Sequence, residues 1–389
     1  MDPAAQVPLA MLLVFASAKI LAEIFERMGQ PGIVGEILAG VLIGPHVLAW
    51  LAPSEFLHTL SDLGVMFLLF RVGLEIKSSE LMKVSGIGLL VALAGIVLPF
   101  LAGWGISSLW GKPQLESIFT GAAMVATSVG ITAQVLAARG LLNTRAARII
   151  LAAAVIDDVL GLLVLALVSG LAQGGVNYLD LAITAALAIG FTVFVARFGT
   201  RTVRRVMPKM NARMRLVESE FALSMTLLFA LSLLAVYAGV AAIVGAFLAG
   251  MALSDSAEGR VKELTNGVAE LLVPFFLVGI GLNFDITAFA GGRNLALAGT
   301  IFLAAVASKF VGCGLGAISM GRTDAVRVGV GMIPRGEVGM VVAQIGLNMG
   351  VMAHSVYGTI VFMSVATTLI APPLLKLAFR GSRDTISET

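Results

Sequence analysis

The stretch Ala153-Ala-Val-Ile-Asp-Asp-Val-Leu-Gly-Leu-Leu-Val164 places two adjacent carboxylates, Asp157 and Asp158, about halfway along an apolar run at 145–173. A helix of about 20 mostly apolar residues spans membrane hydrocarbon, so the run predicts a membrane helix. A charge at that depth costs about 2.5–3.5 kcal/mol on insertion scales and therefore marks an ion pathway by default. We predict a cation site here; the alternative is a buried ion pair that only ties helices together.

Adjacent helix residues point about 100° apart, so these two carboxylates cannot share one proton across a common face. One of them can line an aqueous cavity while the other meets a neighbouring helix.

The composition of the whole chain supports a membrane setting. Its 389 residues are 58% apolar and only 13% charged, with 44 glycines. A soluble domain carries about 25% charged residues. This excludes a water-soluble enzyme, a nucleic-acid binder and a disordered scaffold. The single cysteine, Cys313, excludes an internal disulfide framework and a cysteine-based metal site.

The apolar runs divide the chain into thirteen predicted membrane segments, joined by short connections, so the expected fold class is an all-α membrane protein. The segments are 7–27, 31–52, 58–76, 84–110, 115–138, 145–173, 177–206, 217–238, 240–254, 266–283, 293–320, 323–348 and 355–380.

The positions of the basic residues predict the orientation in the membrane. If the N-terminus is external and the chain alternates, twenty of the 26 Lys and Arg residues fall on the cytoplasmic side and two, Lys112 and Arg293, on the outer side. Cytoplasmic loops carry the excess of Lys and Arg, so we expect the N-terminus outside and the C-terminus in the cytoplasm. The net charge of +3 then reflects topology, and no nucleic-acid partner is expected.

Three short motifs recur at nearly one offset. They are Val34 to Gly40 with Val244 to Gly250, Gly73-Leu with Gly281-Leu, and Ser128-Val-Gly with Glu337-Val-Gly. The offset of about 209 residues equals seven segments, an odd number, so the second copy would be inserted upside down. Such inverted repeats are typical of secondary transporters, whose site lies near the midplane at discontinuous helices.

Two segments carry sequence that should interrupt a helix. Ala126-Thr-Ser-Val-Gly-Ile-Thr132 combines hydroxyl and β-branched residues around a glycine, and Met332-Ile-Pro-Arg-Gly-Glu-Val-Gly339 contains Pro and two Gly. Thr127 and Ser128 offer oxygens suited to a hard cation. Arg335 and Glu337 are expected to compensate the dipole ends that the second break exposes.

Lys309 lies near the middle of segment 293–320, which contains no carboxylate. A buried ammonium needs a paired acid, and the aspartates at 157 and 158 lie at matching depth on another helix. Near the N-terminus, Lys19 and Glu23 are spaced i,i+4 and we expect them to pair with each other.

Together, the Ile-Asp-Asp motif ending at Asp158, the lone Lys309 and the two breaks resemble the NapA-type bacterial sodium/proton antiporters of the monovalent cation:proton antiporter-2 family. The resemblance implies an NhaA-like inverted-repeat fold with two crossing discontinuous helices, in a homodimer in the cell inner membrane. It makes Asp158 the main ion-binding carboxylate and Asp157 the partner of Lys309. Sodium would be held by Asp158, Asp157 and Thr127.

The resemblance also implies a division into two moving parts. A dimerisation panel would comprise 1–83 and 214–290, a transport core would comprise 84–173 and 291–389, and a linker helix would lie in 174–213. Because both acids are Asp, the match implies electrogenic exchange of two protons per sodium by an elevator movement, with no cofactor besides the transported ions and with membrane lipid as surroundings. Alternatives are a potassium/proton antiporter of the same fold, a cation channel or, as the enzyme alternative, an intramembrane aspartyl protease, whose Gly-x-Gly-Asp motif is absent.

Overall fold

Lipid offers no water to backbone groups, so an apolar chain of this kind must satisfy its own hydrogen bonds within helices. The computed structural model describes residues 3–28, 30–172, 178–211, 218–256, 259–284 and 292–380, and every regular element in that part is helical. The helices are α1 Pro3–Arg27, α2 Gly32–Ile43, α3 Glu55–Glu75, α4 Ser78–Leu109, α5 Gln114–Ala123, α6 Val129–Ala138, α7 Arg145–Ala172, α8 Tyr178–Asn211, α9 Ser219–Tyr237, α10 Ala242–Leu253, α11 Gly259–Leu282, α12 Gly292–Gly316, η2 Ile318–Met320, α13 Arg322–Gly331, α14 Glu337–Asn348 and α15 His354–Ala378.

Nine helices of the described part are long and apolar enough to cross a membrane. Helices α2 and α10 are apolar but shorter. The predicted segment 31–52 therefore holds a helix only as far as Ile43, because Gly44 and Pro45 follow and the residue before a proline is disfavoured in helix.

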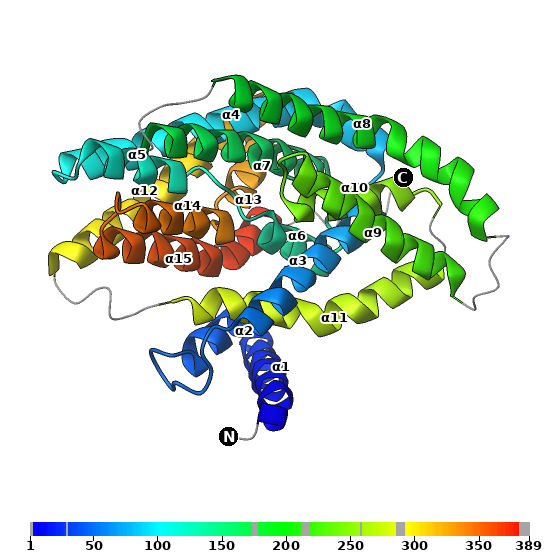
Figure 1. The fold of residues 1–389 in the computed structure, drawn as a ribbon, viewed down its shortest axis with the longest axis horizontal. Helices are drawn as coiled ribbons and strands as arrows, with labels where there is room; N and C mark the ends of the chain where they lie inside the picture. Colours follow the sequence, from blue (N-terminus) through cyan, green and yellow to red (C-terminus); the bar gives the residue numbers. More distant parts are fainter. Residues whose placement is uncertain are drawn as a thin grey trace.

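The two predicted interruptions are confirmed as gaps between helices. Segment 115–138 consists of α5 and α6, and segment 323–348 consists of α13 and α14. In Figure 1, α12 to α15 gather on one side and α9 to α11 on the other, while α6 lies between α15 and α3.

Glycines of the recurring motifs meet at two helix crossings, each of which joins a glycine of one motif to a glycine of the other. Gly40 of α2 packs against the backbone of Gly281 in α11. A Cβ added to Gly40 would lie only 3.0 Å from the Cα of Gly281. Gly73 of α3 packs in the same way against Gly250 of α10. A Cβ added to Gly73 would lie 3.1 Å from the Cα of Gly250. Only glycine allows backbones this close. The echo in sequence therefore corresponds to one kind of crossing used twice.

The expected pairing of Lys19 with Glu23 is wrong. Lys19 Nζ lies 3.1 Å from Glu36 Oε1 on α2, and Glu23 instead binds Arg27 at 2.7 Å. The reason is burial: Glu36 is only 7% exposed and needs a partner, whereas Glu23 is at the surface.

Candidate functional site

The two helix breaks touch each other at the centre of the site. The backbone N–H of Ser128, just before α6, donates to the carbonyl of Pro334 at 2.8 Å. The hydroxyl of Thr132 donates to the carbonyl of Gly331, the last residue of α13, at 2.6 Å. A Cβ on Gly336 would lie 2.6 Å from the side chain of Ser128, so glycine is needed at this contact. The two gaps therefore form one crossing, in which the extended segments form hydrogen bonds to each other's backbone groups.

Arg335 supplies positive charge at the C-terminal end of α5. Its Nη1 donates to the carbonyls of Val125 and Ala126 at 3.0 and 3.1 Å, and its Nη2 donates to Ala305 at 3.4 Å. The residue is fully buried. Val125 and Ala126 follow the C-terminal end of α5, where helix carbonyls carry partial negative charge, so the guanidinium compensates the dipole of α5.

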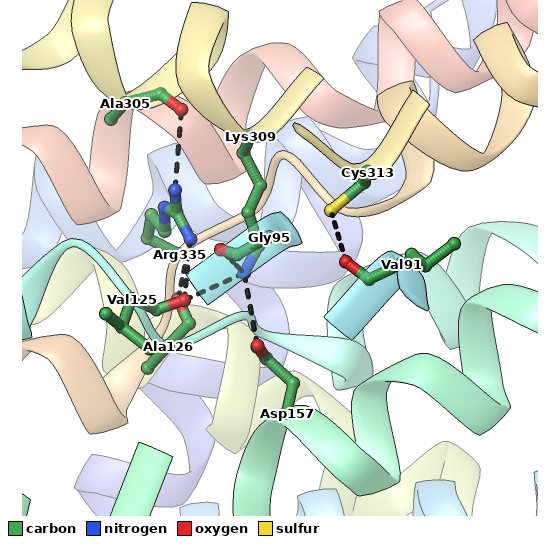
Figure 2. Close-up of polar contacts among 9 residues, drawn as sticks. All are labelled: Val91, Gly95, Val125, Ala126, Asp157, Ala305, Lys309, Cys313 and Arg335. Carbon is green, nitrogen blue, oxygen red and sulfur yellow. Dashed lines mark hydrogen bonds and ion pairs between the residues drawn. The ribbon is translucent and has the colours of Figure 1, made fainter. Parts of the chain in front are cut away.

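Lys309 of α12 joins the crossing to the carboxylate of α7. Its Nζ donates to the carbonyls of Gly95 and Val125 at 2.7 and 2.8 Å and lies 3.3 Å from both carboxylate oxygens of Asp157 (Figure 2). Both side chains of this ion pair are fully buried. The ammonium thus has three acceptors, and one of them, Val125, is shared with Arg335.

The adjacent carboxylates have different surroundings. Asp157 is 1% exposed, whereas Asp158, the next residue of α7, is half-buried. Their side chains diverge around the helix axis, which places one against α12 and leaves the other partly accessible.

The hydroxyls at the first break are buried donors and acceptors. Thr127 and Ser128 are 5% and 3% exposed, and within the described part of the chain neither Thr127 Oγ1 nor Ser128 Oγ has a hydrogen-bond partner. Such oxygens suit a hard cation. Among the described residues, no group of three or more His, Cys, Asp or Glu side chains could hold a metal ion. The Glu337 side chain lies outside the described side chains; its backbone begins α14.

Two clefts flank α6 at its opposite ends. One, of about 690 Å³, lies between α3, α10 and α11 on one wall and α14 and α15 on the other, and Val65 and Phe276 line it. Both side chains contact Gly130 in the first turn of α6, 3.2 Å from the position of a Cβ there. The other, of about 680 Å³, lies beside Gln134 and Arg139 at the far end of α6. Helix α6, which follows the first break, thus lies between two clefts.

Sequence reasoning missed the neutral partners of the crossing. Thr132 lies inside the quoted break, but nothing marked it as a donor, and Gly95 contributes only a backbone carbonyl. A search for charges within apolar segments passes over such residues because hydroxyls and glycines are common in membrane helices.

Comparisons with known proteins agree with this architecture. Residues 11–381 match the family model described as sodium/hydrogen exchanger, transmembrane. The chain is 34% identical over 377 residues to the Na(+)/H(+)-K(+) antiporter GerN of Bacillus cereus, and the aligned residues cover 96% of each chain. It is 32% identical to a Na(+)/H(+) antiporter of Enterococcus hirae, covering 94% of this chain and 96% of the relative. Its fold is similar to that of the sodium proton antiporter MjNhaP1 from Methanocaldococcus jannaschii, with a TM-score of 0.73, 20% identity and coverage of 100% and 99%.

Proposed function

Because this chain belongs to the sodium/hydrogen exchanger family of multi-pass membrane proteins, we propose that it is a secondary antiporter that exchanges sodium for protons across the cell inner membrane. The names of its relatives support the choice of ions. The observation that carries the proposal is the ammonium of Lys309, which binds both the buried carboxylate of Asp157 and the Val125 carbonyl at the helix break.

In the proposed reaction, protons and sodium compete for the carboxylates of α7. Asp158, the more accessible of the two, loses its proton and ligates a partly dehydrated sodium ion. Thr127 and Ser128 supply hydroxyl oxygens whose hydrogen-bonding capacity is unused among the described residues. Asp157 turns from Lys309 towards the ion, and the released ammonium gives up its proton. The cycle then moves two protons for each sodium and needs no cofactor besides these ions.

Such exchange is electrogenic. One net charge enters the cell per cycle, which is worth about 2.3 kcal/mol per 100 mV of membrane potential. A negative interior would therefore help to expel sodium. The neutralisation of Lys309 when Asp157 leaves follows from the cost of an unpaired charge in a fully buried position.

Alternating access is proposed to come from an elevator movement. The core, residues 84–173 and 291–389, would slide against the panel, residues 1–83 and 214–290, with α8 as the link. The two clefts at opposite ends of α6 lie along this boundary and support it. We further propose thirteen crossings, with α2 and α10 as short spans and the α5–α6 and α13–α14 pairs as broken ones, an external N-terminus and a homodimer joined through the panels.

Proteoliposomes that contain the full chain test the proposal. Sodium added outside should drive proton movement, and an imposed potential should change its rate. Asp158→Asn should abolish exchange, whereas Glu263→Gln, which alters an exposed ion pair with Arg260, should leave it intact. Sodium-driven proton movement by the Asp158→Asn variant would overturn the role of this carboxylate.

Potassium/proton exchange is the second candidate, since the relative GerN is named for both sodium and potassium. Transport measured with sodium, lithium and potassium in turn separates the two. A large current that is independent of the proton gradient would instead indicate a channel.

A further inference from the structure

Two adjacent threonines of α15 bind the backbone N–H and the backbone carbonyl of Arg335, which lies in the second helix break. The backbone N–H of Arg335 donates to Thr367 Oγ1 at 3.1 Å, and the hydroxyl of Thr368 donates to the carbonyl of Arg335 at 2.6 Å. Both threonines are fully buried. The Thr367 hydroxyl donates its own hydrogen to the carbonyl of Ser364 at 3.0 Å, which leaves its lone pairs for the Arg335 N–H.

The backbone of Arg335 needs these partners because of where it lies. Helix α13 ends at Gly331 and α14 begins at Glu337, so the N–H and carbonyl of Arg335 belong to neither helix. A buried backbone group without a partner is costly, and the two threonine hydroxyls bind both backbone groups of Arg335. A threonine donor and a threonine acceptor one residue apart replace the missing helix bonds.

The same contacts determine where the Arg335 side chain can reach. The guanidinium extends from this fixed backbone to the carbonyls of Val125 and Ala126 across the crossing. Val125 also accepts from Lys309, so Arg335 and Lys309 share one oxygen atom. A shift of Arg335 therefore changes the bonds available to the ammonium that pairs with Asp157.

We propose that Thr367 and Thr368 are positioning residues for the ion site, acting through Arg335 on the Val125 carbonyl and on Lys309. The proposal rests on the function proposed above. It assigns to α15 a part in cation binding, although no charged side chain of α15 enters the crossing in the described structure. The two threonines stay with Arg335 during transport, since all three lie in the core.

Isosteric removal of the hydroxyls tests the proposal in the full chain. Thr368→Val should raise the sodium half-saturation concentration about tenfold and shift the pH profile of exchange, because the Arg335 carbonyl loses its donor. Thr368→Ser keeps the hydroxyl and should restore both values to within about twofold of the unaltered chain. The matched control is Thr359→Val on the same helix, whose buried hydroxyl donates only to Ser355 within α15. It should leave half-saturation and pH profile unchanged.

Equal half-saturation and equal pH profile in Thr368→Val and Thr359→Val would overturn the proposal. Should Thr368→Val fail to fold, Thr367→Val is the second test. It removes the acceptor of the Arg335 N–H and the donor to the Ser364 carbonyl, and it is expected to show the same changes in smaller degree. No change in Thr367→Val would overturn the proposal equally.

Hydrogen exchange at the Arg335 amide tests the two bonds from the threonines to the Arg335 backbone, here called the clamp, independently of transport. The amide should exchange faster in Thr367→Val than in Thr359→Val, and equal exchange would overturn the clamp even if sodium exchange by the unaltered chain is established. Faster exchange together with no sodium-driven proton movement by the unaltered chain would overturn the proposed function and leave the clamp standing.

Discussion

Asp157→Asn is the substitution that most directly probes the buried ion pair. Asparagine keeps the shape of the side chain and removes its charge. Lys309 would then face two carbonyls, Gly95 and Val125, and no anion, in a place where neither side chain of the original pair is exposed. An ammonium in such a site has lost its water without a compensating charge.

The expected loss follows from that burial. Removing one partner of a buried ion pair costs about 3–5 kcal/mol, because the remaining charge is uncompensated. The loss should therefore lower Tm clearly below that of the unaltered chain. Lys309→Gln should cause a fall of similar size, since it leaves the carboxylate unpaired.

The double variant Asp157→Asn, Lys309→Gln separates the pair from its surroundings. It removes both charges, and the glutamine amide can still donate to a carbonyl, so its Tm should lie above that of either single variant. Thermal unfolding of the purified protein measures all three. Arg27→Gln is the control, because it breaks an ion pair of which both side chains are well exposed and should change Tm little. Single variants no less stable than this control, or a double variant whose losses simply add, would refute the reasoning.

Two further substitutions test the crossing and the boundary around α6. Gly336→Ala should abolish sodium exchange and destabilise the protein by about 1–3 kcal/mol, because the added methyl overlaps the side chain of Ser128. The control, Gly299→Ala, has open space around the added methyl and should be neutral or slightly stabilising. Thermal unfolding and transport assays measure both variants, and equal behaviour of the two would contradict the prediction. Gln134→Ala removes the 2.7 Å bond from Arg71 that links α3 to α6, and a hydrogen bond to a charged group contributes about 1.5–3 kcal/mol. Because α3 belongs to the proposed panel and α6 to the proposed core, this bond would stabilise only one position of the core. Its loss should therefore change the ratio of the sodium half-saturation concentrations on the two membrane faces about tenfold or more, and an unchanged ratio would contradict this role.

Composition and local pattern determined much about this protein before any coordinates. A low charge content in long apolar runs requires a membrane protein, because too few polar residues exist to cover a soluble surface. Proline and glycine at 334 and 336 forced a break, since they act on the backbone where they stand. The deep carboxylates stood out for the same local reason, because burying charge in lipid is costly.

Only the tertiary structure decided which groups meet. The residues by themselves left open which aspartate Lys309 contacts, because the rotation of each helix about its own axis depends on its neighbours; the structure selects Asp157. Arg335 compensates the end of α5, a half-helix about 210 residues away, and Lys19 binds α2 instead of its own helix. The threonines of α15 carried no signal at all, since neutral hydroxyls become informative only when a broken backbone is packed against them.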